Sequence, residues 1–164
     1  MNIRTASLKD YDAIYSIAVI TWNHTYKEIL SAEQFSYMMD MMYSQQAIEQ
    51  QITVKNHRFL IAEDADGNAL GFCSYETDNE PGKTKIHKLY VLPQTHGQGL
   101  GKCFVKKVES AAVSAGNNSI FLNVNRFNPA YYFYLKTGFK NNGEVNVEIG
   151  NGYLMEDYIM EKPL

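Results

Sequence analysis

The sequence predicts one α/β domain that spans residues 1–164, with a mixed sheet and flanking helices. Helix-period apolar residues fill the first third of the chain, and strands with two further helices are expected from residue 58 onward. The chain also lacks an internal repeat, a low-complexity tract and a linker. A chain of this length can bury one hydrophobic core.

Charge and composition narrow the possible partners. The net charge of -3 gives no global basic field that would attract nucleic acid or an anionic membrane. No apolar run has the length of a membrane span, and the first residues lack the apolar run of a signal peptide, so we expect a cytoplasmic protein. Cys73 and Cys103 are expected to be two reduced core thiols rather than a disulfide or a metal site.

The first third of the chain predicts a strand and three helices. Residues 3–6 form a short opening strand, and Ser7 with Asp10 resembles a capping box at the start of a helix. Ser31 begins a second helix that runs to about Tyr43, and its methionine stripe is expected to fill the core. Residues 44–54 form a third, more polar helix.

The remaining two thirds of the chain predict six strands and two helices. The expected strands are 58–62, 69–76, 84–92 and 119–124, followed by two more within 139–160 around a Gly-Asn-Gly turn; the expected helices are 99–115 and 128–138, and residues 77–83 form a polar loop. Asn128 and Pro129 open the last helix as a cap and a first helical residue, and Gly138 closes it.

A glycine-rich turn joins the strand 84–92 to the helix that follows. Gly97, Gly99 and Gly101 let several backbone N–H groups face one concavity at a helix N-terminus, which suits a phosphate or diphosphate, and Lys102 could reach an outer phosphate. A Walker P-loop would need glycine at 96 and a hydroxyl at 103, and a dinucleotide fold would need Gly-x-Gly-x-x-Gly; neither pattern is present. An ordinary strand-to-helix turn remains the structural alternative.

The turn resembles motif A of the GNAT superfamily of N-acetyltransferases, Gln/Arg-x-x-Gly-x-Gly/Ala, in the form His96-x-x-Gly99-x-Gly101. The segment from Asn128 through Ala130 and Phe133-Tyr134 to Lys136 and Gly138-Phe139 is similar to motif B of the same family. The resemblance covers nearly the whole chain. It implies acetyl-CoA as cofactor and a mostly antiparallel sheet in which one parallel strand pair splays apart.

The resemblance assigns the cofactor to two segments. It implies cofactor binding by Leu89, Tyr90, Val91, Gly97, Gln98, Gly99, Leu100, Gly101, Lys102, Asn125 and Asn128. The strand residues among these would pair with the pantetheine arm beside a β-bulge, which also explains why Ile86 and Leu89 break the alternation of apolar residues. Asn128 has an alternative role as a helix cap.

The catalytic residues follow from the same resemblance and from acid–base chemistry. Tyr134 occupies the position of the family's acid, which protonates the leaving thiolate, and the alternative is a core tyrosine. His87 is the candidate base because of its titration range, Glu76 is a second candidate, and water chains would make a dedicated base unnecessary.

Trp22, His24 and Tyr26 are the candidate acceptor pocket, where aromatic faces would attract an ammonium group; packing of the helix junction is the alternative. The leading function is therefore transfer of acetyl from acetyl-CoA to a small-molecule or peptide amine, without a metal. The chain loosely resembles polyamine acetyltransferases within the family, and analogy favours a homodimer. A non-catalytic acyl-CoA-binding module is the alternative from another class.

Overall fold

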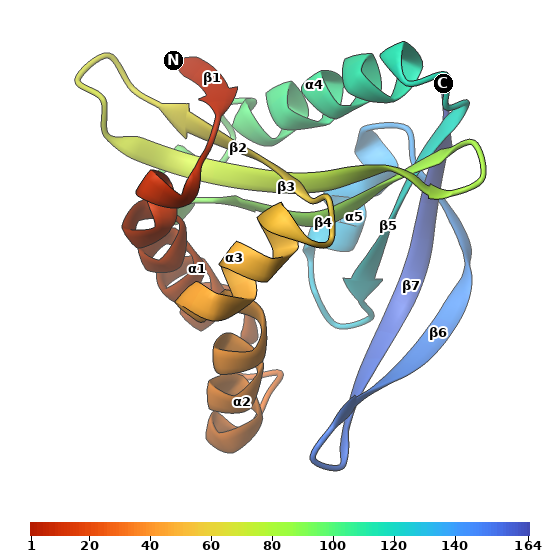
Figure 1. The fold of residues 1–164 in the computed structure, drawn as a ribbon. Helices are drawn as coiled ribbons and strands as arrows, with labels where there is room; N and C mark the ends of the chain where they lie inside the picture. Colours follow the sequence, from red (N-terminus) through yellow and green to blue (C-terminus); the bar gives the residue numbers. More distant parts are fainter. The chain divides into compact units, whose positions relative to one another are not determined.

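The computed structural model describes residues 1–164. The strands are β1 Asn2–Thr5, β2 Arg58–Glu63, β3 Ala69–Glu80, β4 Lys83–Val91, β5 Ser119–Asn125, β6 Lys140–Gly150 and β7 Tyr153–Pro163, and the helices are α1 Tyr11–Tyr26, α2 Ala32–Tyr43, α3 Gln45–Thr53, α4 Leu100–Ser114 and α5 Ala130–Lys136 (Figure 1). The chain divides into two compact units, Met1–Glu76 with Lys88–Lys106 and Thr77–His87 with Lys107–Leu164.

The strands form one sheet of seven strands in the order β1-β2-β3-β4-β5-β7-β6. β4 and β5 pair in parallel, whereas β1 with β2, β2 with β3, β5 with β7 and β6 with β7 pair antiparallel. The predicted mixed, mostly antiparallel sheet is therefore confirmed.

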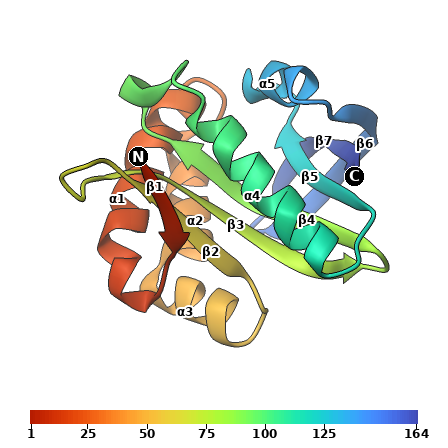
Figure 2. The same ribbon diagram turned by 90° about the horizontal axis from the view of Figure 1, so that it is seen from above.

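In the first unit, side-chain caps set the helix boundaries. Ser7 and Asp10 form the expected capping box, which starts a short 3-10 turn that leads into α1. Ser31 accepts a hydrogen bond from the amide of Gln34 and starts α2. β1 lies beside β2 in both views (Figures 1 and 2), and Arg4 of β1 bonds to Asp10 and to Glu63 of β2.

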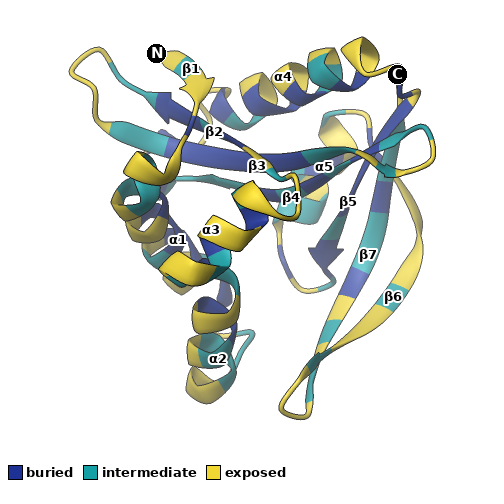
Figure 3. Ribbon diagram, in the orientation of Figure 1, coloured by how far each residue is buried: buried dark blue, intermediate teal, exposed yellow.

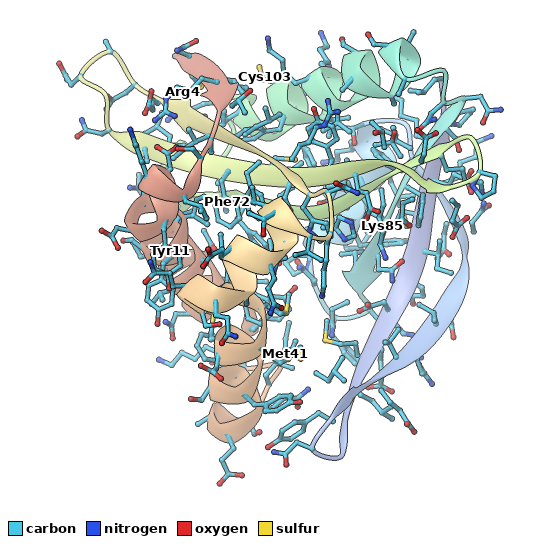
Figure 4. The ribbon with its side chains drawn as sticks, viewed as in Figure 1. Arg4, Tyr11, Met41, Phe72, Lys85 and Cys103 are labelled. Carbon is cyan, nitrogen blue, oxygen red and sulfur yellow. The ribbon has the colours of Figure 1, made fainter.

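The core of the first unit is aromatic. Trp22, Tyr43, Phe59 and Phe72 are each at most 1% exposed, and their rings contact one another between the helices and the sheet (Figure 4 labels Phe72). Burial of such large rings is a major source of stability. The methionine stripe of α2 contributes two buried residues to this unit, which confirms the prediction that it fills the core.

In the second unit, β5 is the central strand and β6 is an edge. Most of β5 is buried, whereas nearly all of β6 is exposed or half-buried (Figure 3). α5 ends at Lys136, and Gly138, two residues further on, has a φ of 98°, the left-handed conformation that terminates a helix. The two final strands flank the predicted Gly-Asn-Gly turn, and β7 continues to Pro163, three residues beyond the predicted end.

Two expectations were wrong. Residues 77–83 are not a polar loop, because β3 continues to Glu80 and β4 already begins at Lys83; Asn117 holds this extension by accepting from the amide of Asp78 and donating to its carboxylate. Cys73 is buried as expected, but Cys103 is exposed. The buried face of α4 consists of other residues, Leu100, Phe104, Val105, Val108 and Ala112. None of the helices combines the length and apolar character that a membrane span requires.

Candidate active site

The glycine-rich turn in the first unit has an open backbone. Gly97 and Gly99 have φ values of 79° and 80°, in the left-handed region that glycine adopts without strain. A Cβ atom built on either residue would have no heavy atom within 4 Å. The glycines are therefore required by the backbone conformation and leave free space over the turn.

The turn presents unpaired N–H groups at the start of α4. The amides of Gly99, Leu100, Gly101 and Lys102 donate to no carbonyl of the chain, while the amide of Cys103 bonds to the oxygen of Gly99 and begins the helical pattern. The side chain of Leu100 is 1% exposed and anchors the helix start, and Lys102 is exposed. This arrangement fits the pyrophosphate of coenzyme A, because it combines oriented donors, the positive end of a helix and a nearby cation.

The end of β4 leads into this turn. Leu89, Tyr90 and Val91 are half-buried, and the ring of Tyr90 packs 5.7 Å from that of Phe72. Gly71 of β3 passes so close that a Cβ atom there would lie 2.7 Å from the carbonyl oxygen of Tyr90. Gly71 therefore permits the close approach of β3 to the end of β4, and the sequence analysis missed this role.

Parallel pairing of β4 with β5 covers only Lys83 to Ile86, which pair with Ser119 to Leu122, although β4 continues to Val91 and β5 to Asn125. Within the second unit the parallel pairing ends at Ile86 and Leu122, and the splaying of the pair stays a prediction. Part of the break in apolar alternation between Ile86 and Leu89 has a simpler explanation. Every second residue from Thr84 is buried, namely Thr84, Ile86 and Lys88, so the inward position after Ile86 holds a lysine instead of an apolar residue. The β-bulge stays a prediction.

Lys88 is a buried cation that the sequence analysis did not identify. It is 5% exposed, donates to the side-chain oxygen of Gln51 at 2.6 Å, and lies over the rings of Tyr43 and Phe59 at 5.5 and 5.8 Å. Burial and, as a smaller cause, the nearby charge of Lys55 lower the pKa of Lys88 from 10.5 to about 7. Its position in step with Thr84 and Ile86 was the available signal.

In the second unit, Tyr134 lies on α5 and is 7% exposed. Its ring packs 5.2 Å from Phe133 and 5.5 Å from Phe139. Asn125 and Asn128, both buried, use their side-chain oxygens within the turn before α5: Asn125 accepts from the amide of Phe127, and Asn128 from that of Ala130. Asn128 thus lies one residue before the N-cap position of α5, which Pro129 occupies, and its bond to Ala130 supports the turn that leads into the helix.

The two base candidates lie in different units. Glu76, at the end of the first unit's part of β3, has a carboxylate oxygen 3.8 Å from Nε2 of His57. His87, in the second unit's part of β4, is half-buried. Their roles as bases stay predictions.

The candidate acceptor residues lie on α1 in the first unit. Trp22 and Tyr26 are 1% and 6% exposed, with ring centroids 4.7 Å apart, so both also serve the core. His24 is exposed, and its ring lies 6.0 Å from that of His96. A nitrogen of His96, the residue that replaces the usual Gln or Arg of motif A, lies 3.2 Å from the carbonyl oxygen of Val91.

Comparison with known proteins identifies the family. A family model described as "Acetyltransferase (GNAT) domain" matches residues 24–161. The chain is 28% identical over 158 residues to the uncharacterized N-acetyltransferase Rv2669 of Mycobacterium tuberculosis, covering 96% of this chain and 99% of that protein. It is 27% identical over 166 residues to the spermidine N(1)-acetyltransferase of Thermoplasma acidophilum, covering 99% of this chain and 96% of that protein.

Solved structures agree with this result. The crystal structure of the PaiA N-acetyltransferase from Thermoplasma acidophilum in complex with coenzyme A has a TM-score of 0.82 and 27% identity, covering 99% of this chain and 98% of that chain. A GCN5-related N-acetyltransferase from Rhodopseudomonas palustris shares the fold, with a TM-score of 0.81 and 21% identity.

The chain therefore belongs to the GNAT family of acetyltransferases. It uses acetyl-CoA and transfers the acetyl group to an amine. A non-catalytic acyl-CoA-binding module is not favoured, because the relatives over the full length of the chain are named as N-acetyltransferases.

Proposed function

We propose that the chain acetylates a primary amino group of a polyamine. The observation that supports this acceptor is the similarity to a spermidine N(1)-acetyltransferase over nearly the whole length of both chains. The net charge of -3 agrees with a cationic acceptor, because a weakly acidic protein does not repel it.

In this proposal the backbone amides from Gly97 to Lys102 bind the pyrophosphate of acetyl-CoA, and Leu89 to Val91 offer backbone groups to its pantetheine arm. The N–H groups of Gly99 to Lys102, which donate to no carbonyl of the chain, and the left-handed Gly97 and Gly99 support the first assignment. Asn125 and Asn128 are proposed to contact the same cofactor. Bound acetyl-CoA supplies the thioester that the amine attacks.

Tyr134 holds the proton that the leaving sulfur needs, and donates it from its phenolic oxygen. His87 is the proposed acceptor of the amine's proton, with Glu76 as the second candidate. Trp22, His24 and Tyr26 are proposed to face the acceptor, where His24 is the exposed member of the three. A homodimer is proposed by family analogy.

The acceptor class is tested by an acetylation screen with purified protein and acetyl-CoA against spermidine, spermine, amino acids, aminoglycosides and peptide N-termini. We expect the highest kcat/KM with a polyamine. A protein that acetylates an amino acid or a peptide better than every polyamine would overturn the acceptor class.

The catalytic role of Tyr134 is tested by Tyr134→Phe, with Tyr132→Phe as the matched control on the exposed side of α5. Loss of the phenolic proton should lower kcat by about a hundredfold or more, the usual size of a general-acid contribution, with unchanged CoA affinity. The control should retain full activity. An unchanged kcat in Tyr134→Phe would refute the assignment.

A further inference from the structure

Lys88 connects several elements of the first unit through one buried side chain. Its ammonium nitrogen donates to Oε1 of Gln51 on α3 at 2.6 Å and lies over the rings of Tyr43, at the end of α2, and of Phe59 on β2. Gln51 in turn donates from Nε2 to the carbonyl oxygen of Met42, in the last turn of α2, at 2.9 Å. One lysine of β4 thus connects the sheet to α2 and α3.

Few other buried side chains hold α3 in place. The helix has nine residues, most of them exposed (Figure 3), and its buried residues are Ile48 and Gln51. Ile48 is therefore the one buried apolar residue of α3. An element with so little buried apolar surface opens at a lower cost in free energy than the core of a protein. The bond between Gln51 and Lys88 thus carries weight in keeping α3 closed.

The charged form of Lys88 is poorly satisfied beneath α3. An ammonium group has three N–H donors, and Lys88 uses one of them in its bond to Gln51. The residue is 5% exposed, so bulk water has little access to the other two. Burial, with a smaller contribution from the charge of Lys55, accordingly lowers the pKa of Lys88 to about 7.

The groups around Lys88 do not neutralise its charge. Tyr43 stays a neutral phenol, because burial raises its pKa well above the usual value. Lys55, just after α3, adds a second positive charge, and Phe59 carries none. No carboxylate of the chain bonds to Lys88. The charged form is therefore disfavoured while α3 covers it, and it gains water when α3 moves away.

We propose that Lys88 is a pH-sensitive latch, which holds α3 on the sheet firmly when its amine is neutral and weakly when it is charged. Opening of α3 removes Gln51 from the amine and admits water, so the open state binds a proton up to a higher pH than the closed state. The opening constant of α3 should therefore fall as the pH rises from about 7 toward 10.5, where the closed state holds the neutral amine and the open state the charged one. The latch operates with any acceptor and is independent of the proposed function.

Native-state hydrogen exchange of the α3 amides, followed by NMR at pH 7 and pH 8.5, measures this opening constant after correction for the intrinsic exchange rates. In wild type the constant should fall by about threefold to fifteenfold between the two pH values, depending on how much water Lys88 gains on opening. In Lys88→Met it should not change with pH, because methionine binds no proton. Ile86→Met, on the same buried face of β4, is the matched control and should behave as wild type.

Three results would overturn the latch. An opening constant in wild type that is equal at both pH values would show that Lys88 stays covered when α3 opens. A pH dependence that persists in Lys88→Met would assign the effect to another group. Amides of α3 that open no more readily than those of β5, the buried strand that reports global unfolding, would show that α3 has no separate opening.

Discussion

Replacing Lys88 by methionine should make the protein more stable at neutral pH and remove a pH dependence of its stability. Lys88 is buried with a single hydrogen bond, to Gln51, and its pKa is lowered to about 7. The unfolded chain binds a proton at this lysine below about pH 10.5, whereas the folded chain does so only below about pH 7. Stability therefore rises with pH between about 7 and 10.5.

The size of this effect follows from the two pKa values. The lowered pKa of Lys88 reduces the free energy of unfolding by about 4 kcal/mol at pH 7 and by about 2 kcal/mol at pH 9. Methionine fills a similar volume without a charge, but it leaves the oxygen of Gln51 without its donor, at a cost of about 1–2 kcal/mol at either pH. The variant should thus be about 2–3 kcal/mol more stable than wild type at pH 7 and nearly equal at pH 9.

Urea unfolding of wild type, Lys88→Met and Ile86→Met at pH 7 and pH 9 measures these differences. Ile86 lies on the same strand and the same buried face and carries no titrating group, so it controls for the methionine side chain. The gap between Lys88→Met and wild type should shrink by about 2 kcal/mol from pH 7 to pH 9. A gap that does not change with pH, or a variant less stable at pH 7, would refute the reasoning.

Three further predictions concern other sites. Gly71→Ala should destabilise the protein by about 1–3 kcal/mol and weaken CoA binding, because the new Cβ atom would meet the carbonyl oxygen of Tyr90. Gly67→Ala, in the open hairpin turn, is the control: thermal melting should show a loss of about 1 kcal/mol, and the CoA affinity should stay unchanged. Gly99→Ala should lower CoA affinity in calorimetry through strain at φ 80°, and an unchanged Kd would count against the phosphate site. The free energy of unfolding of Asp157→Asn should equal that of wild type at pH 4 and exceed it by up to about 3 kcal/mol at pH 7. The reason is that folded wild type keeps the proton of Asp157 up to about pH 6, so that wild type loses stability as the pH rises from about 4 to 6. Equal unfolding curves at pH 7 would contradict this prediction.

Local signals in the sequence predicted most of the fold. The caps at Ser7 and Ser31 and the closing Gly138 act within four residues of their own chain, so the pattern alone is sufficient. The extension of β3 to Glu80 was missed because Asp78 is held by Asn117, 39 residues away. Such long-range bonds depend on the tertiary structure.

In the candidate site, too, local features could be predicted from the sequence and long-range contacts could not. The glycine turn could be predicted because its backbone conformation requires glycine at fixed spacing. For Lys88 the spacing from Thr84 and Ile86 was the one signal, and it is weak because a charged residue in a strand is normally exposed. Only the folded chain shows that Lys88 meets Gln51, 37 residues away, and that Oδ1 of Asp157 meets no donor.

Amide hydrogen exchange of the wild type with and without CoA, resolved residue by residue by NMR, tests the central claim most directly. If the amides of Gly99 to Lys102 bind the pyrophosphate, their exchange should slow markedly on addition of CoA and of 3′,5′-ADP, and change little with pantetheine alone. Unchanged exchange at these four amides, with protection appearing at another segment, would contradict the assignment of the turn.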